Sequence, residues 1–304
     1  MQDKKYTVYS IDKEYGVNIT LESYGEYLRH LELFIFAYDT DQAYEIISRN
    51  YLAYLDSCFF FCSRGQLLSL PNEEFFDNIR IEISRNIMNY LTSARFLEEF
   101  LKQKSNNGTT NVSNAARRAY CIIKENKENN GVLRRLSAIR NYTQHEGLPS
   151  HSMILGSKAL TPDKEGNRRL VRSIEFHFEA SRAKNINHYD HEYISSLEDD
   201  TIDIDQTLRE SVNVYTECLK VVRATISNSN KDNATNYFNE HLKLFGVSEE
   251  ECKKGLLFYP NDGTQDERTK KGNSLSAHFL KYIYSYSSAP KSSIKYTSKE
   301  YFEL

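Results

Sequence analysis

The feature that most constrains the fold is a run of apolar residues at helical spacing between residues 73 and 104. Its members recur every three or four positions, at Ile79, Ile83, Ile87, Leu91 and Ala94. Such a stripe predicts one long amphipathic helix that buries a single face. Only 5 Pro and 12 Gly occur in the 304 residues, which favours long helices over a loop-rich β-sandwich.

Five further segments show the helical pattern: 21–38, 41–62, 112–126, 131–146 and 203–227. Asp39, Thr40 and Asp41 supply candidate caps between the first two segments. Gly147 and Pro149 end the segment 131–146, because glycine favours the position after a helix and proline cannot continue one.

The period changes to that of β-strands after residue 150. Two alternating stretches separated by a turn-forming segment predict a β-hairpin at about 152–183, and residues 1–20 predict a short strand or two. The expected fold is mainly α, a bundle of four to five helices over 41–227 that carries the hairpin. Short α/β extensions flank it at 1–40 and at 228–304, the second of unknown role.

The charge and cysteine content exclude several classes of protein. A net charge of −3 excludes binding of nucleic acid mainly through a polybasic tail. It does not exclude a local basic groove, because phosphate contacts need clustered charge only. Of the five cysteines, Cys58 and Cys62 share one helical face and are expected to be buried core thiols. The N-terminus shows no signal-like apolar run, and the longest apolar cluster, "LELFIFAY", is too short to span a bilayer. We expect a cytoplasmic protein without a membrane partner.

The helix predicted at 131–146 carries two distinct faces. Arg134, Ala138, Asn141 and His145 fall on one stripe, and Ala138 is expected to leave room for a close approach. Arg140 lies between this stripe and the apolar face, and its long side chain can reach either way. The core face is formed by Val132, Leu133, Leu136, Ile139 and Thr143. An alternative interpretation is that the polar stripe is an ordinary solvated face.

The end of this helix, "RNYTQHEGLP" at 140–149, resembles the HEPN superfamily of endoribonucleases and toxins. The signature of that family is an arginine and a histidine separated by four to six residues, often with an asparagine after the arginine. The segment 82–101 also resembles the second long helix of one HEPN group, so the resemblance covers about 41–227. One subgroup has a tyrosine that an antitoxin modifies two residues after the histidine. This chain has Gly147 there, so that modification is not implied.

The resemblance implies an RNA substrate, a two-fold homodimer in which the motif helices face each other, and an inhibitor or antitoxin protein as a further partner. It implies no cofactor and no metal, because RNA supplies its own nucleophile, the 2′-OH. The catalytic candidates are Arg140, Asn141 and His145. Histidine is the side chain that ordinarily titrates near neutral pH, and the planar guanidinium of arginine suits a phosphate.

Three further residues are candidates for RNA binding: Arg134, Arg85 and Tyr142. Arg134 is expected to contact a flanking phosphate. Arg85 forms a polar pair with Asn89 at a spacing of four, and this pair either lines the same cleft or belongs to the polar seam of the bundle. Both interpretations of Arg85 remain open.

The short motif also occurs elsewhere in the chain, so spacing alone is not specific. Arg172 and His177 have the same spacing but fall in a predicted strand, where residues five apart face opposite sides of the sheet. Arg182 and His188 fit the looser spacing. The segment "NHYDHE", with His188, Asp190, His191 and Glu192, is a weaker candidate for a metal site.

The favoured function is a metal-independent endoribonuclease that acts as a toxin or antiviral defence effector. The alternative is a catalytically inactive HEPN-like dimer that binds RNA or a partner protein. A structural adaptor that works through residues 228–304 is a third option.

Overall fold

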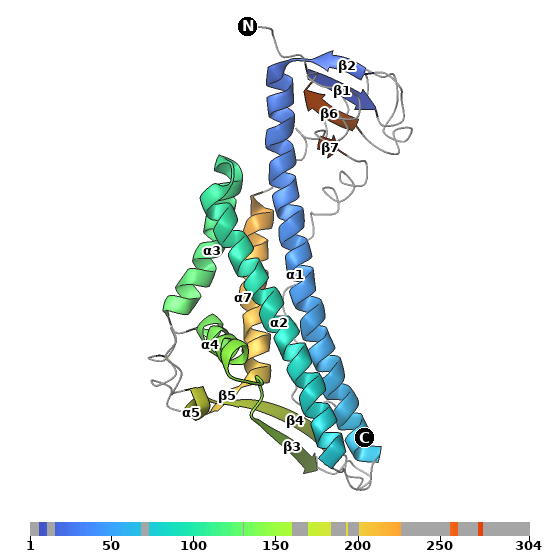
Figure 1. Ribbon diagram of the computed structural model, residues 1–304, viewed down its shortest axis with the longest axis vertical. Coiled ribbons are helices and arrows are strands. Elements are labelled where there is room, and N and C mark those ends of the chain that lie inside the picture. Colours follow the sequence, from blue (N-terminus) through green and yellow to red (C-terminus); the bar gives the residue numbers. More distant parts are fainter. Residues whose placement is uncertain are drawn as a thin grey trace, which may run out of the picture. The chain divides into compact units, whose positions relative to one another are not determined.

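The computed structural model describes residues 6–10, 16–67, 73–129, 131–159, 170–183, 193, 201–225, 256–260 and 273–275. Most of them are helical, and the strands form two small antiparallel sheets (Figure 1). The chain forms two compact units. Unit 1 comprises Met1–Asp39, Asn107–Ala115 and Lys220–Lys291, and unit 2 comprises Thr40–Asn106, Ala116–Leu219 and Ser292–Leu304.

The expected mainly α fold, a helical bundle with a hairpin, is confirmed. The helices of the bundle are α1 (Leu21–Leu67), α2 (Glu73–Asn107), α3 (Thr110–Glu128), α4 (Val132–His145) and α7 (Ile204–Ala224), with the short α5 (Ala180–Ala183) after the hairpin. The apolar stripe of α2 lies on its buried face as predicted, since Ile79, Ile83 and Ile87 have no exposed surface.

The predicted division of the first helical region into 21–38 and 41–62 is wrong. One helix, α1, runs through this region for 47 residues. Thr40 and Asp41 do not cap a helix there and are buried instead. The neighbouring Ala37, Ala43 and Ile47 are also buried, at helical spacing on both sides of the expected break. Burial of a large side chain such as Ile47 contributes about 1.5–3 kcal/mol, more than the roughly 0.7 kcal/mol by which Asp or Thr disfavours a helix interior.

In unit 2, the part of α1 from Thr40 onward lies side by side with α2 and α7 (Figure 1). Side-chain amides join α1 to α2: Asn50 donates to Ser93 (3.1 Å), and Asn86 donates to Ser57 (2.8 Å). The buried Tyr90 hydroxyl of α2 lies 2.6 Å from the Ser211 hydroxyl of α7. The large Tyr90 side chain thus fills this core while its hydroxyl keeps a hydrogen-bond partner.

The hairpin predicted at 152–183 is present as β3 (Ser152–Ala159) and β4 (Leu170–Glu179), with Ser152 opposite His177. A third strand, β5 (Thr201–Asp203), pairs with β4 just before α7 begins. Alternate residues of β4 are buried, as strand geometry requires: Ile174, Phe176 and Phe178.

The strands predicted within residues 1–20 are also present, as β1 (Tyr6–Ser10) and β2 (Gly16–Ile19). Within unit 1, β1 pairs antiparallel with β6 (Leu256–Pro260), which in turn pairs with β7 (Asn273–Leu275). Strands from the two ends of the chain therefore share one four-stranded sheet of order β2-β1-β6-β7.

Cys58 and Cys62 are buried free thiols, as predicted for core positions. Among the helices that the structure describes, none has the length of apolar sequence needed to cross a bilayer.

Candidate functional site

The start of α4 is held by a side chain of the preceding helix. The Asn126 side-chain oxygen accepts a hydrogen bond from the Leu133 backbone N–H (2.9 Å), and the Asn126 carbonyl accepts one from Gly131 (2.7 Å). A Cβ atom at Gly131 would lie 2.5 Å from the Asn126 oxygen, so only glycine fits this turn. Asn126 and Gly131 therefore determine the turn between α3 and α4 and the residue at which α4 begins.

The polar stripe expected on α4 is not a continuous open face. Ala138 is 2% exposed and belongs to the core, so the expectation that it leaves room for a close approach is wrong. Arg134 places its guanidinium carbon 5.0 Å from the ring centre of the buried Tyr193, a cation–π contact. Asn141 is half-buried and His145 is exposed at the last residue of the helix.

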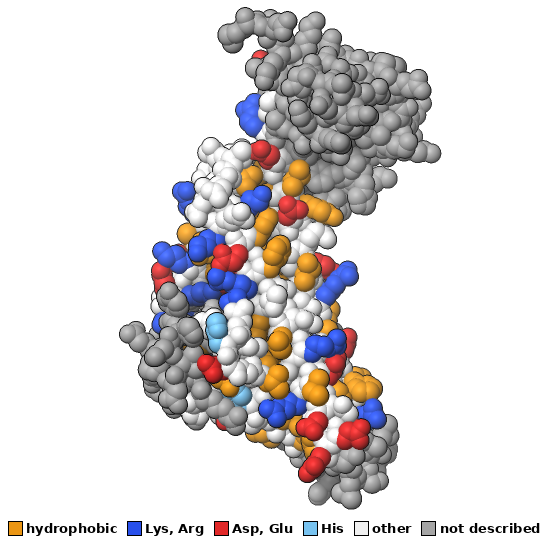
Figure 2. Space-filling model, viewed as in Figure 1, with side chains coloured by type: hydrophobic (Ala, Val, Ile, Leu, Met, Phe, Trp, Pro, Cys, Tyr) orange, Lys and Arg blue, Asp and Glu red, His pale blue; other side chains and the backbone are white. Residues whose placement is uncertain are grey.

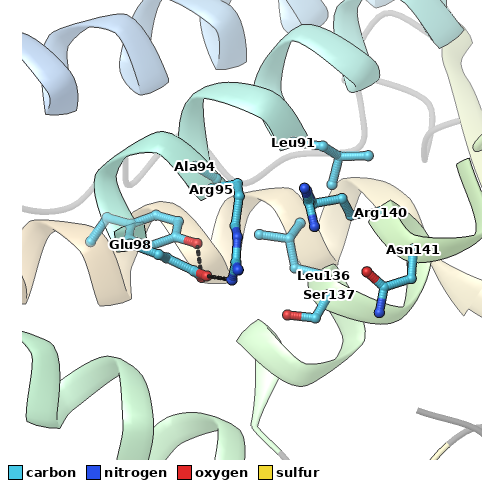
Figure 3. A pocket seen from close by; sticks show the side chains of 9 residues that line it. Leu91, Ala94, Arg95, Glu98, Leu136, Ser137, Arg140 and Asn141 are labelled. Carbon is cyan, nitrogen blue, oxygen red and sulfur yellow. Dashed lines mark hydrogen bonds and ion pairs between the residues drawn. The ribbon is translucent and has the colours of Figure 1, made fainter. Parts of the chain in front are cut away.

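A pocket of about 310 Å³ lies between α2 and α4, with one wall residue from α7 (Figure 3). Its polar lining comes from Arg95 and Glu98 of α2 and from Ser137, Arg140 and Asn141 of α4. Leu91, Ala94, Leu136 and Tyr215 complete the wall. Figure 3 shows the side chains of Arg95 and Arg140 approaching this space from the two opposite helices.

Glu98 is the electrostatic centre of the pocket wall. Its side chain is 7% exposed and accepts hydrogen bonds from Lys127 (2.7 Å) and from the Tyr215 hydroxyl (2.9 Å). Arg95 lies 3.4 Å from the same carboxylate and also pairs with Glu99. Burial, and then the negative charge of Glu98, raise the pKa of Tyr215, so that its hydroxyl stays neutral and donates.

Arg140 differs from the other cations of the pocket. Among the residues that the structure describes, its guanidinium has neither a hydrogen bond nor an ion pair. Burial lowers the pKa of Arg140, and the nearby positive charge of Arg95 lowers it further, while Glu98 and Glu99 raise it. Arginine nevertheless remains charged at neutral pH, so an incompletely solvated cation faces the pocket.

His145 does not line this pocket. It follows Arg140 by five residues, which corresponds to about 140° of rotation around the helix axis beyond one full turn. Within one chain, the pocket thus contains Arg140 and Asn141 of the catalytic candidates but not the histidine.

The other two candidates for RNA binding also lie outside the pocket. Arg85 is ten residues before Arg95 on α2, about 15 Å along the helix, and forms an ion pair with the adjacent Glu82 while its side chain stays 62% exposed. Tyr142 packs its ring edge-on against His151 and Phe178, with ring centres 4.7 Å and 5.2 Å away. Tyr142 therefore anchors α4 to the small sheet.

Arg95, Glu98 and Ser137 are pocket residues that the sequence analysis missed. In the sequence, "ARFLEE" reads as a surface ion pair at helical spacing, which gives no sign of a site. Figure 2 shows Lys and Arg side chains gathered around α4 and the adjacent part of α3. A local basic surface thus exists on a chain whose net charge is −3.

The competing motifs lie elsewhere. Arg172 and His177 are both in β4, as predicted, and the His177 ring lies 3.5 Å from the Glu175 carboxylate. His188, Asp190, His191 and Glu192 lie outside the described residues. No group of three or more His, Cys, Asp or Glu side chains suited to a metal ion occurs in the described part of the chain.

No protein-family model, curated protein or solved structure matches this chain. A functional conclusion therefore depends on the chemistry of the pocket and on the segment 140–149.

Proposed function

We propose that this protein is a metal-independent endoribonuclease of the HEPN type, acting as a toxin or antiviral defence effector. The observation that carries the proposal is Arg140, a half-buried cation without an ion pair among the described residues, which lines a pocket together with Asn141. His145 is exposed at the end of the same helix, where an RNA strand can reach it. The resemblance of 140–149 to the HEPN motif supports the assignment of these residues to RNA cleavage.

In the proposed reaction, the 2′ oxygen of RNA attacks the adjacent phosphorus while the bond from phosphorus to the 5′ oxygen breaks. The products are a 2′,3′-cyclic phosphate and a 5′-hydroxyl. Arg140 stabilises the charge that builds on the phosphoryl oxygens, and Asn141 orients the phosphate through its amide. The partner subunit's His145 accepts the proton of the 2′-OH, and the leaving 5′ oxygen takes a proton from water.

The first test is independence from metal ions. RNA cleavage by the purified protein should continue in excess chelator, because the nucleophile is the 2′-OH and the charge stabilisation comes from arginine. Denaturing gels with end-labelled RNA measure the rate, and mass spectrometry identifies the cyclic phosphate. Loss of all cleavage in chelator, restored by magnesium, would contradict the proposed mechanism.

The second test is a homodimer with α4 close to the two-fold axis. A pocket within one chain lacks the histidine, and a second copy can supply one across a two-fold axis. Light scattering should report twice the monomer mass of 35.4 kDa at micromolar concentration. Mixing inactive Arg140→Ala with inactive His145→Ala subunits should restore part of the activity, since a mixed dimer holds one intact copy of each side chain. A monomer that cuts RNA rules this arrangement out.

A second candidate function is an inactive dimer that binds RNA or a partner protein. The observation in its favour is that His145 lies outside the pocket of Arg140. This function predicts that purified protein binds RNA and leaves it uncut under all of the conditions above.

A further inference from the structure

The pocket beside α4 carries more positive than negative charge. Arg95, Arg140 and Lys127 contribute three cations around it, and Glu98 and Glu99 contribute two carboxylates. The carboxylates pair with Arg95 and Lys127, which leaves the charge of Arg140 uncompensated among the described residues.

Glu98 does not pair with Arg140, and its oxygens bind other groups. One oxygen accepts the Tyr215 hydroxyl, and the other accepts Lys127 and lies 3.4 Å from Arg95. These contacts hold the buried carboxylate in place, and the carboxylate in turn holds Arg95 at the wall of the pocket. Glu98 is thus a positioning residue for Arg95.

The opposite wall offers donors suited to an oxyanion. Arg140 and Asn141 come three and four residues after Ser137, so both lie next to Ser137 on the side of α4 that lines the pocket. Their hydroxyl, guanidinium and amide groups can all donate hydrogen bonds to phosphoryl oxygens. The volume of about 310 Å³ lies at the lower end of small-molecule sites, which begin at about 300 Å³, and is large enough to admit a phosphodiester group of an RNA strand.

We propose that Arg95 and Arg140 grip one and the same phosphodiester group of single-stranded RNA, in a subsite built entirely within one chain. The inference rests on the proposed function and adds Arg95 and Ser137 to its binding machinery. An anion between the two guanidinium groups relieves their mutual repulsion, which lowers the pKa of Arg140 in addition to the larger effect of burial. His145 does not line the subsite. Phosphate binding and proton transfer are therefore carried out by different residues of α4.

The test measures binding of a fluorescein-labelled 2′-O-methyl RNA strand, which lacks the nucleophile and cannot be cut. Fluorescence anisotropy should show about tenfold weaker binding for Arg95→Ala and for Arg140→Ala, and partial recovery for Arg95→Lys. Arg49→Ala is the matched control, since Arg49 is an exposed arginine of α1 that also pairs with a glutamate of its own helix. That variant should bind as wild type does.

The salt dependence tests whether the two arginines share one phosphate. For single strands, each neutralised phosphate contributes about 0.7 to the slope of log K against log salt. The double variant Arg95→Ala/Arg140→Ala should therefore reduce the magnitude of this slope by about 0.7, the value for one phosphate. A reduction of about twice that value would mean that the two arginines bind separate phosphates, and it would overturn the shared subsite. Inorganic phosphate should compete only at concentrations far above those of the strand; equal competition would assign the pocket to free phosphate instead.

The outcomes separate this subsite from the proposed ribonuclease. If wild-type protein cuts RNA while Arg95→Ala binds and cuts equally well, the subsite is wrong and the ribonuclease stands. If Arg95→Ala loses binding but wild-type protein never cuts, the ribonuclease is wrong and the subsite stands. Circular dichroism melting of each variant establishes that lost binding does not come from unfolding.

Discussion

Replacing Arg140 or His145 with alanine should each abolish RNA cleavage while the protein stays folded. The rate should fall by roughly 10²–10⁴, because one variant removes charge stabilisation at the phosphate and the other removes the proton-transfer group. Stability should change little. Arg140 has no ion pair among the described residues and His145 is exposed, so neither side chain holds the core together. Cleavage of labelled RNA and thermal melting by far-UV circular dichroism measure the two effects.

The chain offers a matched control in the competing motif of β4. Arg172→Ala removes an arginine that has the same spacing to a histidine, and it should keep most of the activity. His177→Ala belongs to the same control only if the sheet stays folded, since His177 is half-buried and lies beside Glu175. Normal cleavage by the Arg140 and His145 variants would show that the site is assigned wrongly. Unfolding of these variants would show instead that the two side chains are structural.

Replacing Glu98 with alanine should destabilise unit 2 by about 3 kcal/mol, the cost of breaking a buried, hydrogen-bonded ion pair. The change removes the acceptor of the buried Tyr215 hydroxyl and the partner of Lys127. Glu98→Gln should cost about half as much, because the amide oxygen still accepts from Tyr215 while the attraction to Lys127 is lost. Urea denaturation followed by circular dichroism measures these differences.

The next residue on α2 supplies the control for this prediction. Glu99 also pairs with Arg95, but its side chain is 47% exposed, and Glu99→Ala should change the unfolding free energy by less than about 1 kcal/mol. Equal effects at Glu98 and Glu99 would mean that burial of the Glu98 carboxylate contributes nothing to the stability of the bundle.

Local patterns determined much of the fold. The stripe that begins at Ile79 predicted α2 to within three residues of its end, and the alternation of β4 predicted the hairpin. Both patterns depend only on neighbours in the sequence, because the periods of helices and strands recur within a few residues. The same local reasoning failed at Thr40, where burial of the surrounding residues outweighed the capping tendency of the segment.

The sequence by itself also placed Arg140 and Asn141 on one helix with His145 at its end, because these residues are close neighbours in the chain. Only the tertiary structure brought Arg95 and Glu98 of α2 to the same pocket and paired β1 with β6. It also removed Ala138 from the polar stripe by burying it, and engaged Arg134 with Tyr193. Contacts between residues far apart in the chain depend on which helices and strands pack together. Which elements pack together depends on the total apolar area that entire helix and sheet faces bury. A short pattern of residues does not contain that information.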